Sequence, residues 1–160
     1  MKVIAIDPGY ERVGIAVIEK QIKGKDILIY SDCFKTSAKL PFEKRLVLIG
    51  EEIKKIIKNF SPEVLAIETL FFTTNQKTAM HVSEARGAII YEAMQNGLHI
   101  CEYTPLQIKI AVTGYGKSDK KQICSFLPKL ICIEKDIKHD DEYDAIAVGL
   151  TCLATEKSLF

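Results

Sequence analysis

The sequence predicts a mixed α/β fold in which helices cover both faces of a five-stranded sheet. Short apolar segments rich in β-branched residues follow one another at hairpin distance near the N-terminus. Further on, helix-length segments alternate with other short apolar segments. Three antiparallel strands extended by parallel strands after helical crossovers form a mixed sheet of this class.

The N-terminal part of the chain predicts three strands joined by turns. Lys2–Asp7 and Val13–Glu19 are dense in β-branched residues, and Pro8-Gly9 turns the chain between them. The third predicted strand, Asp26–Thr36, follows after a second turn. We therefore expect an antiparallel unit at the start of the sheet.

The middle of the chain alternates between helix and strand. Phe42–Phe60 carries apolar residues at helical spacing and ends before Pro62. Val64–Glu68 is a short apolar strand that finishes on an acid, as the first strand does. Gln76–Asn96 is predicted to be a long helix because Gly97 provides a C-terminal stop.

The last third is predicted to hold one more strand, an irregular segment and three helices. In chain order they are the strand Leu98–Tyr103, the helices Pro105–Val112 and Ser118–Phe126, the irregular segment Pro128–Lys138, and a helix from Asp140 or Asp141 to about Thr155. Thr104 and Ser118 are the expected N-caps of the first two helices, since their hydroxyls can accept a bond from a free backbone N–H.

Composition limits the class of protein. The chain has 160 residues, of which 48% are hydrophobic and 27% charged, so we expect a single globular domain over residues 1–160. Its apolar segments are too short to span a membrane, and no targeting segment is expected. The five scattered cysteines include no CxxC pair, which argues against a zinc site and favours a reducing, cytoplasmic location.

The net charge of +1 hides an uneven distribution. Basic residues are in excess in segments 1–60 and 104–138, whereas acidic residues are in excess in 61–103 and 139–160. A basic surface around an acidic pocket suits a polyanion held over bound metal. A mixed, solvated surface fits the totals almost as well.

Four acidic residues are the candidate catalytic and metal-binding residues. Asp7 and Glu68 each close an apolar strand, and the crevice beyond strand ends is where α/β sheets place their sites. Asp141 and Asp144 share one face of a helix's first turn. Converging carboxylates repel one another unless a divalent cation joins them, which points to metal-dependent phosphoryl-transfer chemistry.

Structural roles compete with this interpretation. The strand-end acids could cap the following turns, and acids in a first turn stabilise a helix N-terminus. Asp140 and Glu142 project to other faces of the helix and are expected to be solvated. His139 is a candidate for supporting the metal site.

Basic and aromatic residues near these acids are candidate nucleic-acid contacts. Lys109, Lys117 and Lys120 flank a glycine-containing turn and could grip phosphates, although lysine runs also mark ordinary solvated faces. Phe71 and Phe72 lie in the expected loop after the fourth strand. Either ring could stack on a base or could plug the loop from below.

The ordered motifs resemble the RuvC family of Holliday junction resolvases, within the ribonuclease H-like superfamily, over nearly the whole chain. They are Asp7-Pro8-Gly9 with Gly14, Ala66-Ile67-Glu68 with Phe71 and Asn75, Ala85-Arg86-Gly87, Tyr103, Gln107-Ile108-Lys109, Gly114-x-Gly116 and Asp141-x-x-Asp144-Ala145-Ile146-Ala147. A strand-ending Asp-x-Gly alone is weak, but the ordered set is specific.

The resemblance implies a homodimeric endonuclease that cuts two opposed strands of four-way junction DNA in recombination and repair. Asp7, Glu68, Asp141 and Asp144 would hold two Mg²⁺ ions, with Mn²⁺ as a substitute, and hydrolysis would leave 5′-phosphate ends. Lys109, Lys120 and Phe71 match family residues that contact the junction. The family also implies partnership with the RuvA–RuvB branch-migration complex.

Three other functions remain open from the sequence. A kinase of the actin-like class needs a second domain, for which the chain is too short. A ribonuclease H-like enzyme acting on RNA would share the acids. A catalytically inert junction-binding module would lack one of them, and all four are present. The expected dimer surface is the helix Gln76–Asn96, with Ala79, Met80 and Ile90, although these residues could equally belong to the core.

Overall fold

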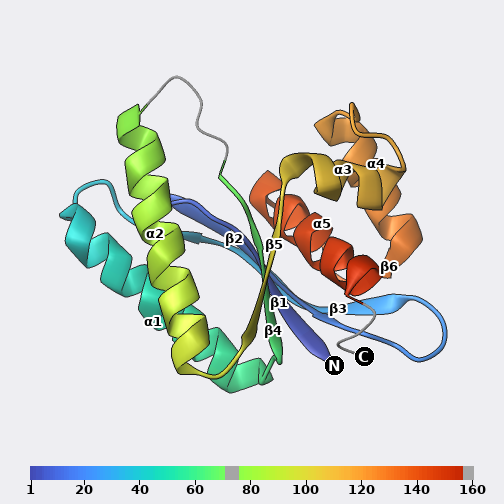
Figure 1. Cartoon of the computed structure of the whole chain (residues 1–160), viewed down its shortest axis with the longest axis horizontal. Helices are drawn as coiled ribbons and strands as arrows, with labels where there is room; N and C mark the ends of the chain where they lie inside the picture. The colour runs from blue at the N-terminus through green and yellow to red at the C-terminus, as the bar shows by residue number, and fades with distance from the viewer. Residues whose placement is uncertain (71–75, 157–160) are drawn as a thin grey trace.

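A six-stranded mixed sheet forms the centre of the protein, in the order β5-β4-β1-β2-β3-β6 (Figure 1). The computed structural model describes residues 1–70 and 76–156. The strands are β1 (Lys2–Asp7), β2 (Arg12–Glu19), β3 (Asp26–Lys35), β4 (Val64–Glu68), β5 (His99–Tyr103) and β6 (Ile131–Cys132). Strands β1, β2 and β3 pair antiparallel, whereas β1–β4, β4–β5 and β3–β6 are parallel pairs.

Helices lie on both faces of this sheet. They are α1 (Phe42–Phe60), α2 (Gln76–Gln95), α3 (Pro105–Thr113), α4 (Lys120–Leu130) and α5 (Asp140–Thr155). Helices α1 and α2 cover one face, and α3, α4 and α5 lie on the other (Figure 1). Within the described ranges, no helix is both long and apolar enough to cross a bilayer.

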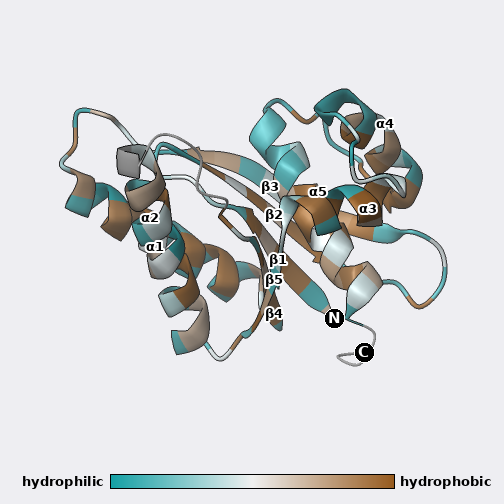
Figure 2. Ribbon diagram, turned by 45° about the horizontal axis from the view of Figure 1, so that its top comes forward, coloured by the Kyte–Doolittle hydropathy of each residue, from teal (hydrophilic) through white to brown (hydrophobic). Residues whose placement is uncertain are grey.

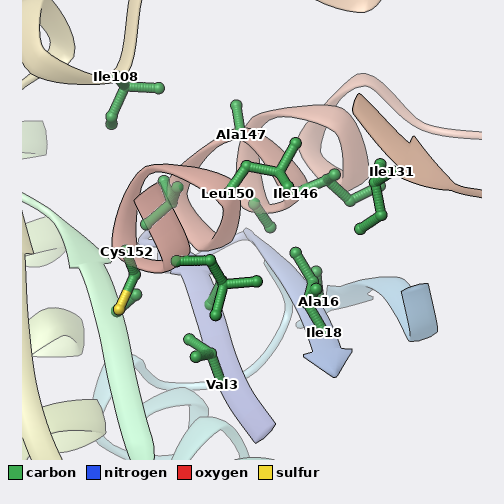
Figure 3. Packing of buried hydrophobic residues seen from close by; sticks show 14 of the residues in the cluster. Val3, Ala16, Ile18, Ile108, Ile131, Ile146, Ala147, Leu150 and Cys152 are labelled. Atoms are coloured by element: carbon green, nitrogen blue, oxygen red, sulfur yellow. The ribbon is translucent and has the colours of Figure 1, made fainter. Parts of the chain in front are cut away.

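Alternating strand residues belong to two separate hydrophobic cores. On β1, Ile4 and Ile6 point into the core under α1 and α2, while Val3 and Ala5 point into the core under α5. This alternation is what the two-residue period of a strand dictates when both faces are covered. Figure 3 shows the second core, where residues of α5 meet β1 and β2.

Helix α5 contains Asp141 and Asp144, and small residues let this helix pack close to the sheet. A Cβ added at Gly149 would come within 2.6 Å of Ile18 Cδ1 and 3.0 Å of Ala5 Cβ. The helix changes from a hydrophilic first turn to a hydrophobic remainder (Figure 2). Burial of the apolar part therefore holds the acidic first turn at one end of the sheet.

The predicted fold class is confirmed, with differences in the region after α3. The predicted sheet had five strands, but segment 128–138, expected to be irregular, contributes a sixth, β6. That strand has two residues, which is too short to show a period in the sequence.

Helix α4 begins and ends later than predicted. Its N-cap is Asp119 rather than Ser118, because Asp119 and Gln122 form a reciprocal capping box. The Ser118 hydroxyl is buried and instead donates to the Tyr115 carbonyl oxygen, 2.7 Å away. The helix continues to Leu130 with Pro128 inside its last turn.

Candidate active site

Three of the four predicted acids meet at one cavity. Strands β1 and β4 run parallel with Ile6 opposite Ile67, so the next residues, Asp7 and Glu68, end side by side. Both line a cavity of about 290 Å³ together with Asp144 of α5. Sequence-distant carboxylates are thus gathered where the strand ends meet the first turn of α5.

Burial and mutual repulsion favour the protonated form of these carboxyl groups. Burial, followed by the charges of Asp144, Glu68 and Asp141, raises the pKa of Asp7 to about 7. Burial and the charge of Asp144 likewise raise the pKa of Glu68 to about 7, against the opposing effect of Lys109. Near neutral pH, protons therefore compete with any cation for both side chains.

A lysine partly neutralises the third acid of the cavity. Lys120 of α4 donates to Asp144 Oδ2 over 2.8 Å and lies 3.6 Å from Asp140. Burial raises the pKa of Asp144, although the Lys120 ammonium opposes this shift. Asp140 itself is exposed and does not line the cavity.

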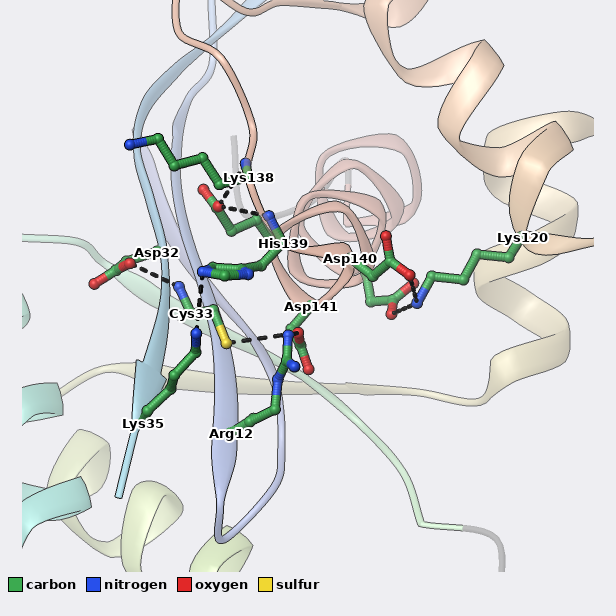
Figure 4. Close-up of polar contacts among 11 residues, drawn as sticks. Arg12, Asp32, Cys33, Lys35, Lys120, Lys138, His139, Asp140 and Asp141 are labelled. Carbon is green, nitrogen blue, oxygen red and sulfur yellow. Dashed lines mark hydrogen bonds and ion pairs between the residues drawn. The ribbon is translucent and has the colours of Figure 1, made fainter. Parts of the chain in front are cut away.

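Asp141 lies beside the cavity rather than in its wall. Its carboxylate forms an ion pair with Arg12, and Cys33 Sγ donates to the same oxygen over 3.5 Å (Figure 4). Partial burial would raise the pKa of Asp141, but the bonds from Arg12 lower it overall. Gly14 makes this position possible, because a Cβ there would meet the Asp141 carbonyl oxygen at 2.1 Å.

Glu142 corrects the expectation that it is solvated. Its side chain is 2% exposed and accepts bonds from Ser31 and Lys135 at 2.6 and 2.7 Å. The backbone N–H groups of Lys138 and His139 donate to its other oxygen. Glu142 therefore fixes the start of α5 to β3, and His139 is the N-cap residue of that helix.

The predicted DNA contacts divide into three groups. Lys109 and Lys120 line the cavity. Lys117 is exposed and is not part of the cavity wall. Phe71 and Phe72 lie outside the described residues, so their roles stay predictions.

Two arginines also shape the site: Arg86, which belongs to the predicted Ala85-Arg86-Gly87 motif, and Arg12, which no predicted motif includes. Arg86 of α2 donates through Nε to the Glu68 carbonyl oxygen over 3.1 Å and pairs with Glu102. Arg12 holds Asp141. Arg12 lies two residues before Gly14, the residue opposite Asp7 in the hairpin, so strand register is the signal that points to it.

The chemistry of the donor set fits a hard divalent cation. The cavity offers carboxylate oxygens and no thiolate. Burial first and mutual repulsion second raise the pKa values of Asp7 and Glu68, and a cation would relieve the repulsion. In the described part of the chain, no three His, Cys, Asp or Glu side chains are already grouped closely enough to bind a metal. The acids of α5 are instead paired with Arg12 and Lys120.

The chain is similar to known proteins over almost its whole length. The family model described as crossover junction endodeoxyribonuclease RuvC matches residues 3–152. A protein of that description from Thermosipho melanesiensis is 44% identical over 98% of both chains. Another from Fusobacterium nucleatum is 42% identical over 94% of this chain and 79% of its own length.

Solved structures give the same result. The structure of Thermus thermophilus RuvC in complex with a Holliday junction substrate has a TM-score of 0.91 at 28% identity, covering 99% of this chain and 96% of the other. The yeast mitochondrial resolvase Ydc2, at 14% identity and a TM-score of 0.70, shares the fold. With a family match over almost the whole length and curated relatives above 40% identity, the chain belongs to the RuvC family.

Proposed function

We propose that this chain resolves Holliday junctions by nicking two opposed strands symmetrically, leaving 5′-phosphate ends. The observation that carries the proposal is the meeting of Asp7, Glu68 and Asp144 at one cavity in a chain of this family. The similar structure that holds a junction substrate supports the choice of DNA. Such an activity serves DNA recombination and repair.

The carboxylates of Asp7, Glu68, Asp141 and Asp144 are the proposed metal ligands, for two Mg²⁺ ions with Mn²⁺ as a substitute. When bound, the metal supplies Lewis-acid activation of water and stabilisation of the leaving oxygen. The residues that line the cavity orient the scissile phosphate. The raised pKa values of Asp7 and Glu68 support a site that is completed by cations.

Contacts to the DNA backbone are proposed for Lys109, Lys117 and Lys120, and base stacking for Phe71. Lys109 and Lys120 lie in the wall of the acidic cavity, where an ammonium group can bind a phosphate next to the reacting one. Lys117 extends this basic side along the exposed turn. These contacts position the strand, and none of them reads a base edge.

A homodimer places two such sites on one junction, as paired nicking requires. The proposed dimer surface is the α1–α2 groove, a hollow of about 570 Å³ that includes Val47, Gly50, Gly87, Ala88 and Tyr91. Val47 and Tyr91 are more than half exposed although hydrophobic, which is typical of an uncovered interface. The RuvA–RuvB complex is a proposed partner, and the cytoplasm is the proposed location.

The deciding experiment compares four labelled nucleic acids with Mg²⁺ present: a mobile four-way junction, an immobile junction, a linear duplex and an RNA–DNA hybrid. Symmetric nicks confined to the mobile junction are the expected result. Cleavage of the hybrid would instead favour another branch of the ribonuclease H-like superfamily. Tight junction binding without cleavage would favour an inert binding module.

A further inference from the structure

Arg12 lies between the acidic site and two exposed lysines, Lys35 and Lys138. It begins β2, and its guanidinium pairs with Asp141 Oδ2 (Figure 4). The Arg12 side chain is 47% exposed while that of Asp141 is 21% exposed, so solvent and a large ligand can reach the arginine. The ion pair therefore lies at the boundary between the acidic site and the surface.

Lys35 of β3 lies directly opposite Arg12 across the β2–β3 pair. Its ammonium is 3.2 Å from His139 Nε2, and Lys138 next to it is exposed. We name Arg12, Lys35 and Lys138 the β2–β3 basic edge. Like charges opposite each other across strands are unfavourable unless an anion lies between them. At this edge, the anion that Arg12 now uses is Asp141.

We propose that Arg12 exchanges partners: it neutralises Asp141 in the metal-free protein and binds a DNA phosphate once a divalent cation occupies Asp141. This inference rests on the proposed function. The planar guanidinium suits both a carboxylate and a phosphate. While Arg12 and Asp141 neutralise each other, Arg12 attracts a phosphate only weakly. Release of Arg12 therefore adds one positive charge to the DNA-binding surface.

Lys120 on the other side of the site does not have the same freedom. It contacts Asp140 as well as Asp144, so it keeps an acidic partner when a cation takes Asp144. Among the described residues, Asp141 is the one carboxylate that pairs with Arg12. Cation binding therefore strengthens the binding of DNA through Arg12, and by linkage DNA strengthens the binding of the cation to the same degree.

The first test measures Mn²⁺ binding by calorimetry without DNA. Arg12→Gln removes the competitor for Asp141, so Mn²⁺ affinity rises about two- to fivefold, which corresponds to the strength of an exposed ion pair. Arg12→Lys restores most of the wild-type affinity. Lys35→Gln is the matched control, because among residues 1–70 and 76–156 Lys35 forms an ion pair with no carboxylate. The Mn²⁺ affinity of this variant changes less. Equal affinities of wild type and Arg12→Gln would overturn the proposal.

The second test measures the salt dependence of junction binding in EDTA and in Ca²⁺, which is expected to support binding with little cutting. One phosphate contact contributes a slope of about 0.9 in log affinity against log salt. Arg12→Gln loses this slope in Ca²⁺ and keeps the wild-type slope in EDTA. Lys35→Gln loses the same slope in both solutions.

Two outcomes separate the failure of this inference from the failure of the proposed function. An Arg12→Gln slope that falls equally in both solutions would make Arg12 a permanent phosphate contact and overturn the exchange. A wild-type protein that binds no junction in either solution would overturn the proposed function and, with it, the phosphate half of the exchange. In either case, the Mn²⁺ titration tests whether Arg12 competes with the cation for Asp141.

Discussion

Asp7 holds a carboxyl group where burial and neighbouring acids disfavour its ionisation. Its carboxylate is held near Glu68 and Asp144 at the end of a buried strand, and its pKa is raised to about 7 by burial first and by those charges second. An uncompensated carboxylate in this position is unfavourable for folding. Its retention is explained if a cation normally completes the site.

Asp7→Asn therefore removes cleavage while leaving junction binding nearly unchanged. The amide keeps the size of the side chain but loses the charge that would hold the proposed metal. Junction cleavage in Mg²⁺ and junction affinity in Ca²⁺ measure the two effects separately. Normal turnover by Asp7→Asn would remove Asp7 from the proposed ligand set.

The same substitution changes how the stability of the metal-free protein depends on pH. The folded-state pKa of Asp7 exceeds its usual value of 3.8, so protonated Asp7 is tolerated in the fold better than the ionised form. The free energy of unfolding is therefore highest below pH 4 and falls as pH rises to about 7. The free energy lost is at most roughly 4 kcal/mol for a shift of this size.

Urea unfolding in EDTA at several pH values measures this loss. The wild-type and Asp7→Asn proteins should be similarly stable near pH 4, and Asp7→Asn should become the more stable of the two up to pH 7 and above. Parallel stability curves would show that the Asp7 pKa is not raised.

Some residues of the site could be predicted from the sequence and others could not. Asp7 and Glu68 end apolar strands, and the strand pattern alone brings such ends together. The burial of Glu142 and the pairing of Arg12 with Asp141 depend on the register of β2 and β3 against α5, which no local pattern encodes. Sequence periodicity describes one element at a time, whereas these contacts join three.

At the scale of elements, the approach of α5 to β2 positions Asp141. Gly14 faces the backbone of Asp141, and an added Cβ would lie 2.1 Å from that carbonyl oxygen. Backbone atoms cannot rotate away as a flexible side chain does, so the first turn of α5 has to shift. A Cβ at this position therefore disturbs the site through packing alone.

Gly14→Ala should destabilise the protein by about 1–3 kcal/mol, the usual effect of overpacking, and weaken Mn²⁺ binding. Gly50→Ala is the matched control: a Cβ there meets nothing within 4 Å, and alanine stabilises a helix by up to about 1 kcal/mol relative to glycine. Chemical unfolding and Mn²⁺ calorimetry measure both variants. If Gly14→Ala has wild-type stability and metal binding, close packing of Gly14 against α5 is not needed for the fold or for the site.

The sequence predicted most accurately the elements in which the helical or strand pattern repeats several times. Helix α1 matches its predicted range, Phe42–Phe60, because 19 residues repeat the helical pattern several times. Strand β6 has two residues and exists through its pairing with Asp26 and Ile27. Helix α4 passes through Pro128, a residue that usually predicts an end. Short and irregular elements are fixed by tertiary contacts rather than by their own sequence.

At the scale of the whole molecule, the two faces of the sheet have different roles. The acidic cavity opens among α3, α4 and α5, whereas the α1–α2 groove lies on the opposite face. In the proposed dimer, DNA and the second copy of the chain would therefore occupy different surfaces. This arrangement is compatible with the proposed paired nicking of one junction.

Tyr91→Glu tests the groove as the dimer surface. Tyr91 is 64% exposed, and a buried charge in its place should weaken dimerisation by about 2 kcal/mol or more, roughly thirtyfold in Kd. Light scattering after size exclusion measures the mass, and a junction assay counts paired against single nicks. Ile22→Glu is the matched control, since Ile22 is 100% exposed and lies outside the groove. If the groove holds the dimer, Tyr91→Glu yields monomers that leave single nicks, while Ile22→Glu stays dimeric; a Tyr91→Glu dimer with paired nicking would move the interface elsewhere.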